Sequence, residues 1–250
     1  MLNRTTHISR QINCVLACVA LALAPLLCEG AGKEQLLLNG KDFSGWRKPT
    51  GNWTVARAVR LETGSPTNFV IVPGKGISVN CASGRNSVDL ISEAEFGDVQ
   101  AHVEFCVSRH SNSGVYLMGR YEIQIYDSFG VAQDKYAGIE CGGIYPRWIK
   151  EQNVEGHTPR VNASKPPGEW QSFDITFRAP RFDATGRKVE NARFVKVVHN
   201  GKVIHENVEL TGPTRATLSD EEKALGPLRL QGDHGPVAYR NVRVKPLQLN

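Results

Sequence analysis

The residues best suited to acid–base chemistry lie in a short alternating segment near the middle of the chain. In residues 121–126 (YEIQIY), the side chains of a strand would point alternately to its two faces. Glu122 and Gln124 therefore share one face if Ile123 and Ile125 enter the core. A carboxylate in that position could transfer a proton, and the neighbouring amide could orient a polar substrate.

A second carboxylate, Glu104, alternates in the same way with Val103 and Phe105 in residues 98–107 (DVQAHVEFCV). Two carboxylates on neighbouring strands of one face could work as an acid–base pair. The solvent side of any antiparallel sheet also alternates in polarity, and the pattern by itself favours that simpler interpretation.

The elements that must position these residues are short β-type runs separated by turns. The expected strands are residues 98–107, 114–118, 121–126, 172–178, 194–199, 202–204, 228–231 and 237–244. Gly119-Arg120 and Asn200-Gly201 are predicted to be tight turns, and the second pair is the strongest hairpin signal in the chain.

Helical patterns are almost absent. Ser219 and Glu222 could form a capping box that opens one short helix ending at Gly226. Residues 147–167 read as a long polar loop over one face. The sequence therefore predicts an all-β protein, an antiparallel sandwich or jelly roll, with residues 34–248 as one domain. The predicted core residues are Val103, Phe105, Ile123, Ile125, Ile175 and Phe177.

Composition narrows the class of protein further. The chain has 250 residues, and its 30 Lys and Arg against 25 Asp and Glu give a net charge of +5 that is spread along the chain. Because nucleic-acid binders usually concentrate basic residues, we expect no nucleic-acid partner. Zinc, P-loop, dinucleotide and serine-hydrolase motifs are missing from the sequence.

Residues 1–30 read as a secretion signal. A basic, acid-free start precedes an apolar run at 14–27 that is short for a membrane span. Cleavage after Gly30 would give a secreted or periplasmic protein with no membrane span, although an uncleaved anchor is the alternative. Lipidation at Cys28 is disfavoured because Leu27 precedes it. The remaining Cys81, Cys106 and Cys141 allow at most one disulfide.

Eight segments in order carry a family resemblance. They are LNGKDFSGW at 38–46, NSGV at 112–115, YEIQIYD at 121–127, GGIY at 142–145, KPPGEW at 165–170, NG at 200–201, LQGDHG at 230–235 and YRNVRV at 239–244. Together they resemble the 3-keto-disaccharide hydrolase-like family over about residues 36–247. Residues 182–192 (FDATGRKVENA) depart from the family pattern and are expected to lengthen a hairpin.

The resemblance implies a concanavalin A-like sandwich and an enzyme that cleaves 3-keto-glycosides by hydrolysis or by lyase and hydratase steps. A ketone at C3 acidifies the C2 proton, so a base can remove it and the enolate can expel the group at C1. Glu122 is the candidate base, with Glu104 as a second catalytic candidate, and His234 or Asp233 is the candidate acid. Turn chemistry is the alternative for Asp233 and His234, which precede Gly235 between two strands.

Other residues are candidates for binding the substrate. Arg120 or Lys165 could stabilise the enolate oxygen, although solvated surface charge is as probable for each of them. Tyr145 and Trp148 could stack on a sugar ring, whereas Trp170 fits a core position better. Asn112, Gln124 and Gln231 could form hydrogen bonds with sugar hydroxyls. For Asn112, the favoured role is to fix the conformation of its own loop.

Metal binding is weakly indicated. Asp127 could bind a cation or cap a turn, and no cofactor is strongly implied, although a divalent cation is compatible with the sequence. The rival function is a non-catalytic carbohydrate-binding module, and a third is a plain partner-binding domain. The sequence leaves open the sugar, the linkage, the anomer, the choice between hydrolase and lyase, and the oligomeric state.

Overall fold

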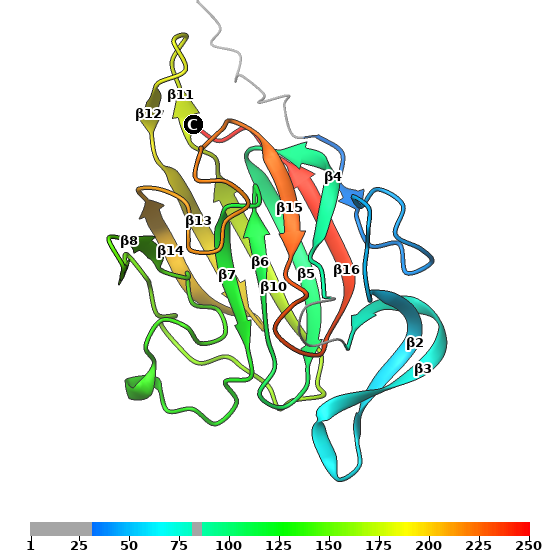
Figure 1. Cartoon of the computed structure of the whole chain (residues 1–250). Coiled ribbons are helices and arrows are strands. Elements are labelled where there is room, and N and C mark those ends of the chain that lie inside the picture. The colour runs from blue at the N-terminus through cyan, green and yellow to red at the C-terminus, as the bar shows by residue number, and fades with distance from the viewer. Residues whose placement is uncertain (1–31, 82–86) are drawn as a thin grey trace, which may run out of the picture.

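Two antiparallel sheets pack face to face in the computed structural model, which describes residues 32–81 and 87–250 (Figure 1). The larger sheet has eight strands and the smaller has four. Their apolar faces meet in one cluster that includes Phe105, Phe173 and Phe177 from the larger sheet and Ile123 and Ile125 from the smaller one. The fold is therefore the antiparallel β-sandwich that the sequence predicts.

The larger sheet runs in the order β14-β13-β10-β5-β16-β3-β2, and β1 pairs with β16 beside it. Its strands are β1 (Gln35–Leu36), β2 (Thr54–Glu62), β3 (Ser65–Asn80), β5 (Val99–Val107), β10 (Gln171–Arg178), β13 (Ala192–His199), β14 (Lys202–Leu210) and β16 (Val237–Pro246). The paired β2 and β3 continue beyond the sandwich as a curved arm, drawn in cyan in Figure 1.

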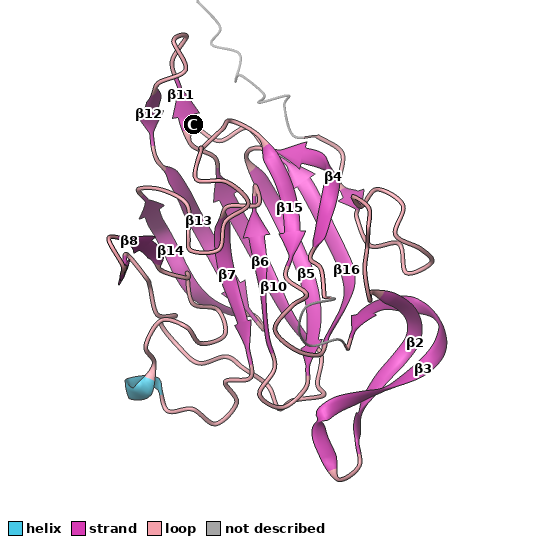
Figure 2. Ribbon diagram, in the orientation of Figure 1, coloured by secondary structure: helices cyan, strands magenta, loops and turns pink. Residues whose placement is uncertain are grey.

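The smaller sheet runs in the order β4-β15-β6-β7 and lies in front of the larger one in Figure 1. Its strands are β4 (Leu90–Phe96), β6 (Asn112–Leu117), β7 (Tyr121–Tyr126) and β15 (Gly226–Leu230). Two small hairpins, β8 (Arg147–Ile149) with β9 (Gln152–Val154) and β11 (Arg181–Phe182) with β12 (Lys188–Glu190), and one 3-10 turn, η1 (Gln133–Lys135), lie in the connections (Figure 2).

Period-two patterning identified the central strands well. All six predicted core residues are fully buried: Val103, Phe105, Ile123, Ile125, Ile175 and Phe177. The Asn200-Gly201 turn is confirmed, with φ angles of 49° and 79°. The expected loop at 147–167 contains the β8–β9 hairpin, and the segment at 182–192 forms much of the β11–β12 hairpin, as expected. Strands β1 to β4 were not predicted because their residues alternate poorly.

The predicted short helix after Ser219 is wrong. The Ser219 hydroxyl accepts a hydrogen bond from the Glu221 backbone N–H at 3.1 Å, which forms only a local turn. The Glu222 carboxylate accepts from the Tyr121 hydroxyl at 2.5 Å and pairs with Lys188. These tertiary contacts occupy the side chain that a capping box would need, and the segment continues as turns into β15.

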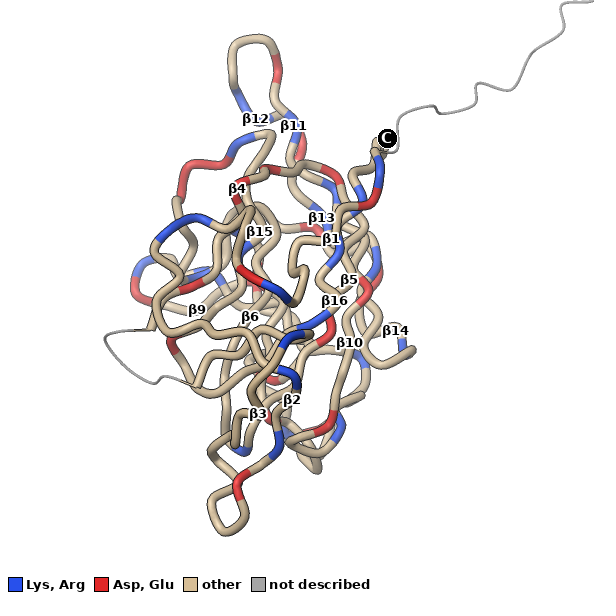
Figure 3. Tube along the Cα trace, turned by 90° about the vertical axis from the view of Figure 1, so that its right-hand side faces the viewer, with Lys and Arg blue, Asp and Glu red and all other residues tan. Residues whose placement is uncertain are grey.

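Charged residues of both signs are distributed along many elements of the trace (Figure 3). Cys81, Cys106 and Cys141 are all free thiols, so the described part of the chain contains no disulfide. Within residues 32–81 and 87–250, no helix is long and apolar enough to cross a membrane.

Replacing a core aromatic residue should destabilise the sandwich. The Phe105 ring lies 4.8 Å from the Phe173 ring between centroids, and both are fully buried. Phe105→Ala should lower the free energy of unfolding by about 3–5 kcal/mol, measured by denaturant titration. Phe129→Ala is the control, because Phe129 is 54% exposed and its loss should cost less than about 0.5 kcal/mol. Equal losses for the two variants would contradict this core assignment.

Candidate functional site

The outer face of the smaller sheet carries polar side chains from three neighbouring strands. The register sets Gly114 opposite Gln124, Tyr116 opposite Glu122, and Arg229 opposite Tyr116. Because the residues between them enter the core, the whole polar set faces away from the larger sheet. The set consists of Asn112, Gly114, Tyr116, Glu122, Gln124, Arg229 and Gln231.

Two connections cover this face. Residues 142–145 run along the free edge of β7, where the Gln124 N–H donates to the Gly143 carbonyl at 2.8 Å and the Tyr145 N–H donates to the Glu122 carbonyl at 3.2 Å. The second connection meets the same edge near the start of β7, where the Thr214 hydroxyl accepts from the Glu122 N–H at 3.1 Å and donates to the Arg120 carbonyl at 2.9 Å. The second connection contributes Arg215 and Ala216.

The face and its covers enclose a pocket of about 240 Å³. That volume is several times the roughly 30 Å³ that one water molecule takes up in the liquid. Its lining residues are Asn112, Tyr116, Glu122, Gln124, Tyr145, Arg215, Ala216, Gln231 and His234. The pocket therefore contains six of the predicted site residues: Glu122, His234, Gln124, Asn112, Tyr145 and Gln231.

The Glu122 carboxyl is buried, with only 2% of the residue exposed. Removal from water raises the pKa of Glu122 to about 8, because the charged form loses its hydration. A hydrogen bond from Tyr116 and the charge of Arg229 oppose the rise in pKa, whereas the carboxylates of Asp89 and Asp233 add to it. At neutral pH the side chain is therefore mostly protonated.

Gly114 makes room for this carboxyl. A methyl group built on Gly114 would lie 2.2 Å from Glu122 Oε1 and 3.0 Å from a carbon of the Tyr116 ring. Both distances are shorter than non-bonded atoms adopt, so the Glu122 side chain can lie across β6 only because this position has no Cβ.

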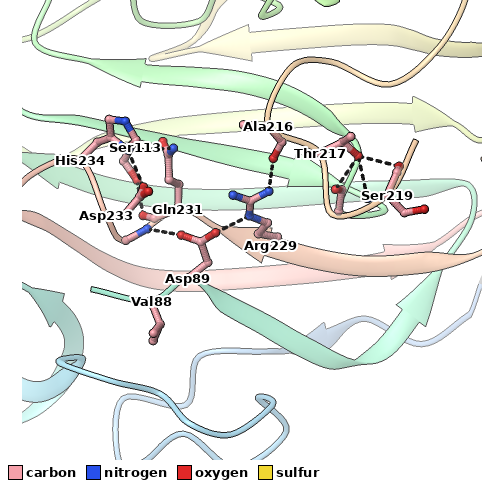
Figure 4. Close-up of polar contacts among 12 residues, drawn as sticks. Val88, Asp89, Ser113, Ala216, Thr217, Ser219, Arg229, Gln231, Asp233 and His234 are labelled. Atoms are coloured by element: carbon pink, nitrogen blue, oxygen red, sulfur yellow. Dashed lines mark hydrogen bonds and ion pairs between the residues drawn. The ribbon is translucent and has the colours of Figure 1, made fainter. Parts of the chain in front are cut away.

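Arg229 connects the floor of the pocket to one of its covers (Figure 4). Its Nε donates to Asp89 Oδ2 at 2.6 Å, and its guanidinium carbon lies 4.3 Å from the centroid of the Tyr116 ring. A terminal nitrogen donates to the carbonyl of Ala216, a residue with a left-handed φ of 60°. The other oxygen of Asp89 accepts from the Gly232 N–H at 2.8 Å, so one carboxylate holds both the Arg229 side chain and the backbone that follows β15.

His234 stands at the rim with an acidic partner. Its Nδ1 lies 2.5 Å from Asp233 Oδ1 and 3.2 Å from Gln231 Nε2 (Figure 4). The short carboxylate contact favours the proton on Nδ1. Nε2, which no other described residue bonds, is then the atom that could exchange a proton with a ligand.

Three amide oxygens in this pocket lack partners. Asn112 Oδ1, Gln124 Oε1 and Gln231 Oε1 are buried, and no described residue donates to them. A buried acceptor without a donor costs about 1–3 kcal/mol. All three residues line one pocket, so they are candidates to accept hydrogen bonds from the hydroxyl groups of a ligand.

Glu104 lies elsewhere. It belongs to β5 of the larger sheet, where Arg240 Nε donates to it at 2.5 Å and Asn241 Nδ2 at 2.6 Å. The expectation that Glu104 and Glu122 form a pair on neighbouring strands of one face is therefore wrong, because their strands belong to different sheets. Alternation places a residue on a face but does not identify the sheet.

Neither candidate for the enolate oxygen lines the pocket. The Arg120 guanidinium donates to the Glu221 carbonyl and to the Met118 carbonyl, each at 2.8 Å. Lys165 Nζ donates to the Trp170 carbonyl at 3.1 Å. The Trp170 ring centroid lies 4.1 Å from the Arg240 guanidinium carbon. Trp170 is half-buried and packs against a smaller buried cluster that includes Phe69, Ile77 and Val79, which agrees with the predicted core position.

Asp127 caps a turn. Its Oδ2 accepts from the His110 N–H at 3.0 Å, and His110 has a left-handed φ of 61°. Among the described residues, no group of three or more His, Cys, Asp and Glu side chains is arranged to hold a metal ion. Trp148 lines a neighbouring cavity instead of this pocket.

Sequence reasoning missed Tyr116, Arg215 and Ala216 as pocket residues, and it missed Arg229, which lies beside Tyr116 on the same face. Alternation against Val115 would have placed Tyr116 on the Glu122 face, and alternation against Leu230 would have placed Arg229 there. Arg215 lies in a connection, where no periodic signal exists. It forms no ion pair with any described residue, and its guanidinium lies over Trp148 instead.

Comparisons with known proteins agree with this architecture. A family model described as a 3-keto-alpha-glucoside-1,2-lyase-like domain matches residues 33–245. A crystal structure from Parabacteroides distasonis ATCC 8503, described as a "putative glycosyl hydrolase", is 25% identical, with a TM-score of 0.61 over 86% of this chain and 84% of that one. No curated protein sequence matches the chain.

Two more structures with the same description and organism share the fold. They are 18% and 17% identical, with TM-scores of 0.53 and 0.55. Each comparison covers 86% of this chain, and 94% and 100% of the respective relative.

The buried Glu122 carboxyl should make stability depend on pH. Its pKa is about 8 in the folded state against an ordinary value of 4.5, so between these values only the folded state holds the proton. Unfolding free energy should therefore fall by up to about 1.4 kcal/mol for each pH unit across that window. Glu122→Gln removes the titrating group, so its stability relative to wild type should rise with pH. A stability difference that stays constant from pH 5 to 8 would contradict the burial of an ionisable group.

Proposed function

Because the chain belongs to the 3-keto-alpha-glucoside-1,2-lyase-like family, we propose that it cleaves 3-keto-glycosides in the pocket on the outer face of its smaller sheet. The observation that supports this most directly is one shared pocket. A buried, ionisable Glu122 stands there with a histidine at the rim and three amide oxygens without partners. Such a pocket combines proton transfer with the recognition of hydroxyl groups.

The proposed reaction begins at C2 of the sugar. Glu122, in its ionised form, removes the C2 proton, and the electron pair of that bond forms an enolate with the C3 ketone. The enolate then re-forms the ketone while a C1–C2 double bond develops and the C1–O bond breaks. The leaving oxygen takes a proton from His234. Water adding across the C1–C2 double bond completes a net hydrolysis.

The surroundings support these roles. A base with a pKa near 8 is a stronger proton acceptor than an ordinary carboxylate, although a smaller fraction of it is ionised at neutral pH. Asp233 orients the His234 ring through its contact with Nδ1. Arg215 replaces Arg120 and Lys165 as the cation for the enolate oxygen, because it lines the pocket and has no competing ion pair with a described residue.

Binding would rest on the amide oxygens and one aromatic ring. Asn112, Gln124 and Gln231 would accept hydrogen bonds from sugar hydroxyls, and Tyr145 would contact the ring from the covering segment. A substrate would relieve the cost of leaving these acceptors without donors.

Export is a further part of this proposal. The basic start and apolar run of residues 1–30 support a cleaved secretion signal and a secreted or periplasmic protein. That segment lies outside the described residues.

The base assignment is tested with Glu122→Gln, which preserves size and removes the base. Turnover of a 3-keto-glycoside should fall about 10²–10⁴-fold while binding survives, because that is the usual contribution of general acid–base catalysis. The wild-type rate should rise with pH through about 8 as the carboxylate forms. Gln124→Ala is the matched variant and should weaken binding more than turnover.

Isotope exchange distinguishes the mechanism from direct displacement at C1. Turnover in deuterated water should place deuterium at C2, and the unoxidised glycoside should be inert. A rate that falls through pH 8 would assign Glu122 as the acid instead. Retention of the original C2 hydrogen would exclude elimination, and binding without any cleavage by wild type would identify a carbohydrate-binding module.

A further inference from the structure

A second cavity adjoins the pocket and shares a wall with it. Its volume is about 450 Å³, and Arg215 and Ala216 line both spaces. The first pocket, at about 240 Å³, is smaller than the roughly 300–1,000 Å³ typical of small-molecule sites, whereas the two spaces together fall within that range. The first pocket thus has room for only part of a larger ligand.

Trp148 is the aromatic residue of the second cavity. It lies in β8 and is 49% exposed, so a large part of its indole ring is in contact with solvent. The Arg215 guanidinium lies 4.1 Å from the centroid of its ring. This contact ties the orientation of the pocket's free cation to the aromatic wall of the neighbouring space.

Polar groups complete the wall around the indole. Arg147 is held by Glu155 and Thr211 through one terminal nitrogen, but its Nε is buried and has no partner among the described residues. Asp220 adds acceptor oxygens to the same wall. An aromatic ring, a guanidinium and a carboxylate lining one space are features suited to a hydroxyl-bearing sugar ring.

We propose that this second cavity binds the leaving group of the glycoside as a sugar ring, with Trp148 as the residue that determines specificity for it. The inference rests on the proposed function, which breaks the bond between C1 and the leaving oxygen. The two halves of the substrate then lie on either side of Arg215 and Ala216. Trp148 acts on the choice of leaving group and takes no part in proton transfer.

The test compares two 3-keto-glucosides that differ only in the leaving group, one carrying a second glucose and one carrying a methyl group. Trp148→Ala should lower kcat/KM for the disaccharide about five- to tenfold more than for the methyl glycoside, and the difference should appear in KM. A loss of kcat shared by both substrates would report the release of Arg215 from the indole. Trp148→Phe should recover part of the loss because a ring is retained. Ile149→Ala is the control on the same hairpin, since Ile149 is 36% exposed and does not line the cavity.

Equal losses on both substrates, or no loss on either, would overturn the assignment of the second cavity. Calorimetric binding of the unoxidised disaccharide and methyl glucoside separates this result from the catalytic proposal. One outcome is that wild type cleaves neither 3-keto-glucoside and still binds the unoxidised disaccharide more tightly than Trp148→Ala does. In that case the cavity assignment stands and the proposed reaction is wrong. Disaccharide binding that ignores Trp148→Ala would overturn the cavity assignment whatever the enzyme cleaves.

Discussion

The removal of the Glu122 carboxyl from water is the constraint on which the rest of the site depends. A buried carboxylate is costly, so the folded protein favours the neutral form at neutral pH. Three neighbouring residues accommodate the buried Glu122 carboxyl. Gly114 leaves the space, the Tyr116 hydroxyl bonds the carboxyl, and Arg229 lies over the Tyr116 ring. Each of these residues is on the same outer face of the smaller sheet.

That burial is achieved by connections and not by the sheet, so the connections must be held firmly. Lys188 of the β11–β12 hairpin donates to the Thr211 carbonyl at 2.8 Å and pairs with Glu222, which in turn accepts from Tyr121. The segment between Thr211 and Glu222 carries Arg215 and Ala216 into the pocket. The β11–β12 hairpin therefore braces the segment that closes the site.

The outer faces of the two sheets show how one pattern leads to two outcomes. On the larger sheet, His102 Nδ1 lies 2.6 Å from Asp174, and Glu104 is bonded by Arg240 and Asn241. These polar groups pair with one another near solvent, although His102 Nε2 has no hydrogen-bond partner among the described residues. On the smaller sheet, covering segments bury acceptors such as Gln124 Oε1, to which no described residue donates. A row of alternating polar residues becomes a binding site only where something covers it.

The sequence by itself determined the central strands, the core residues and the face on which Glu122 and Gln124 lie, because alternation in a strand is a local property of the backbone. Turn residues such as Asn200-Gly201 were equally readable, since their left-handed φ angles restrict the residue types. Only the tertiary structure decided which sheet each strand joined, and this separated Glu104 from Glu122. It also brought Arg215 and His234 to the pocket from connections without periodic patterns, and replaced a local helix cap at Glu222 with contacts to Tyr121 and Lys188. Contacts between residues far apart in the chain depend on how the sheets pack, and no local pattern encodes them.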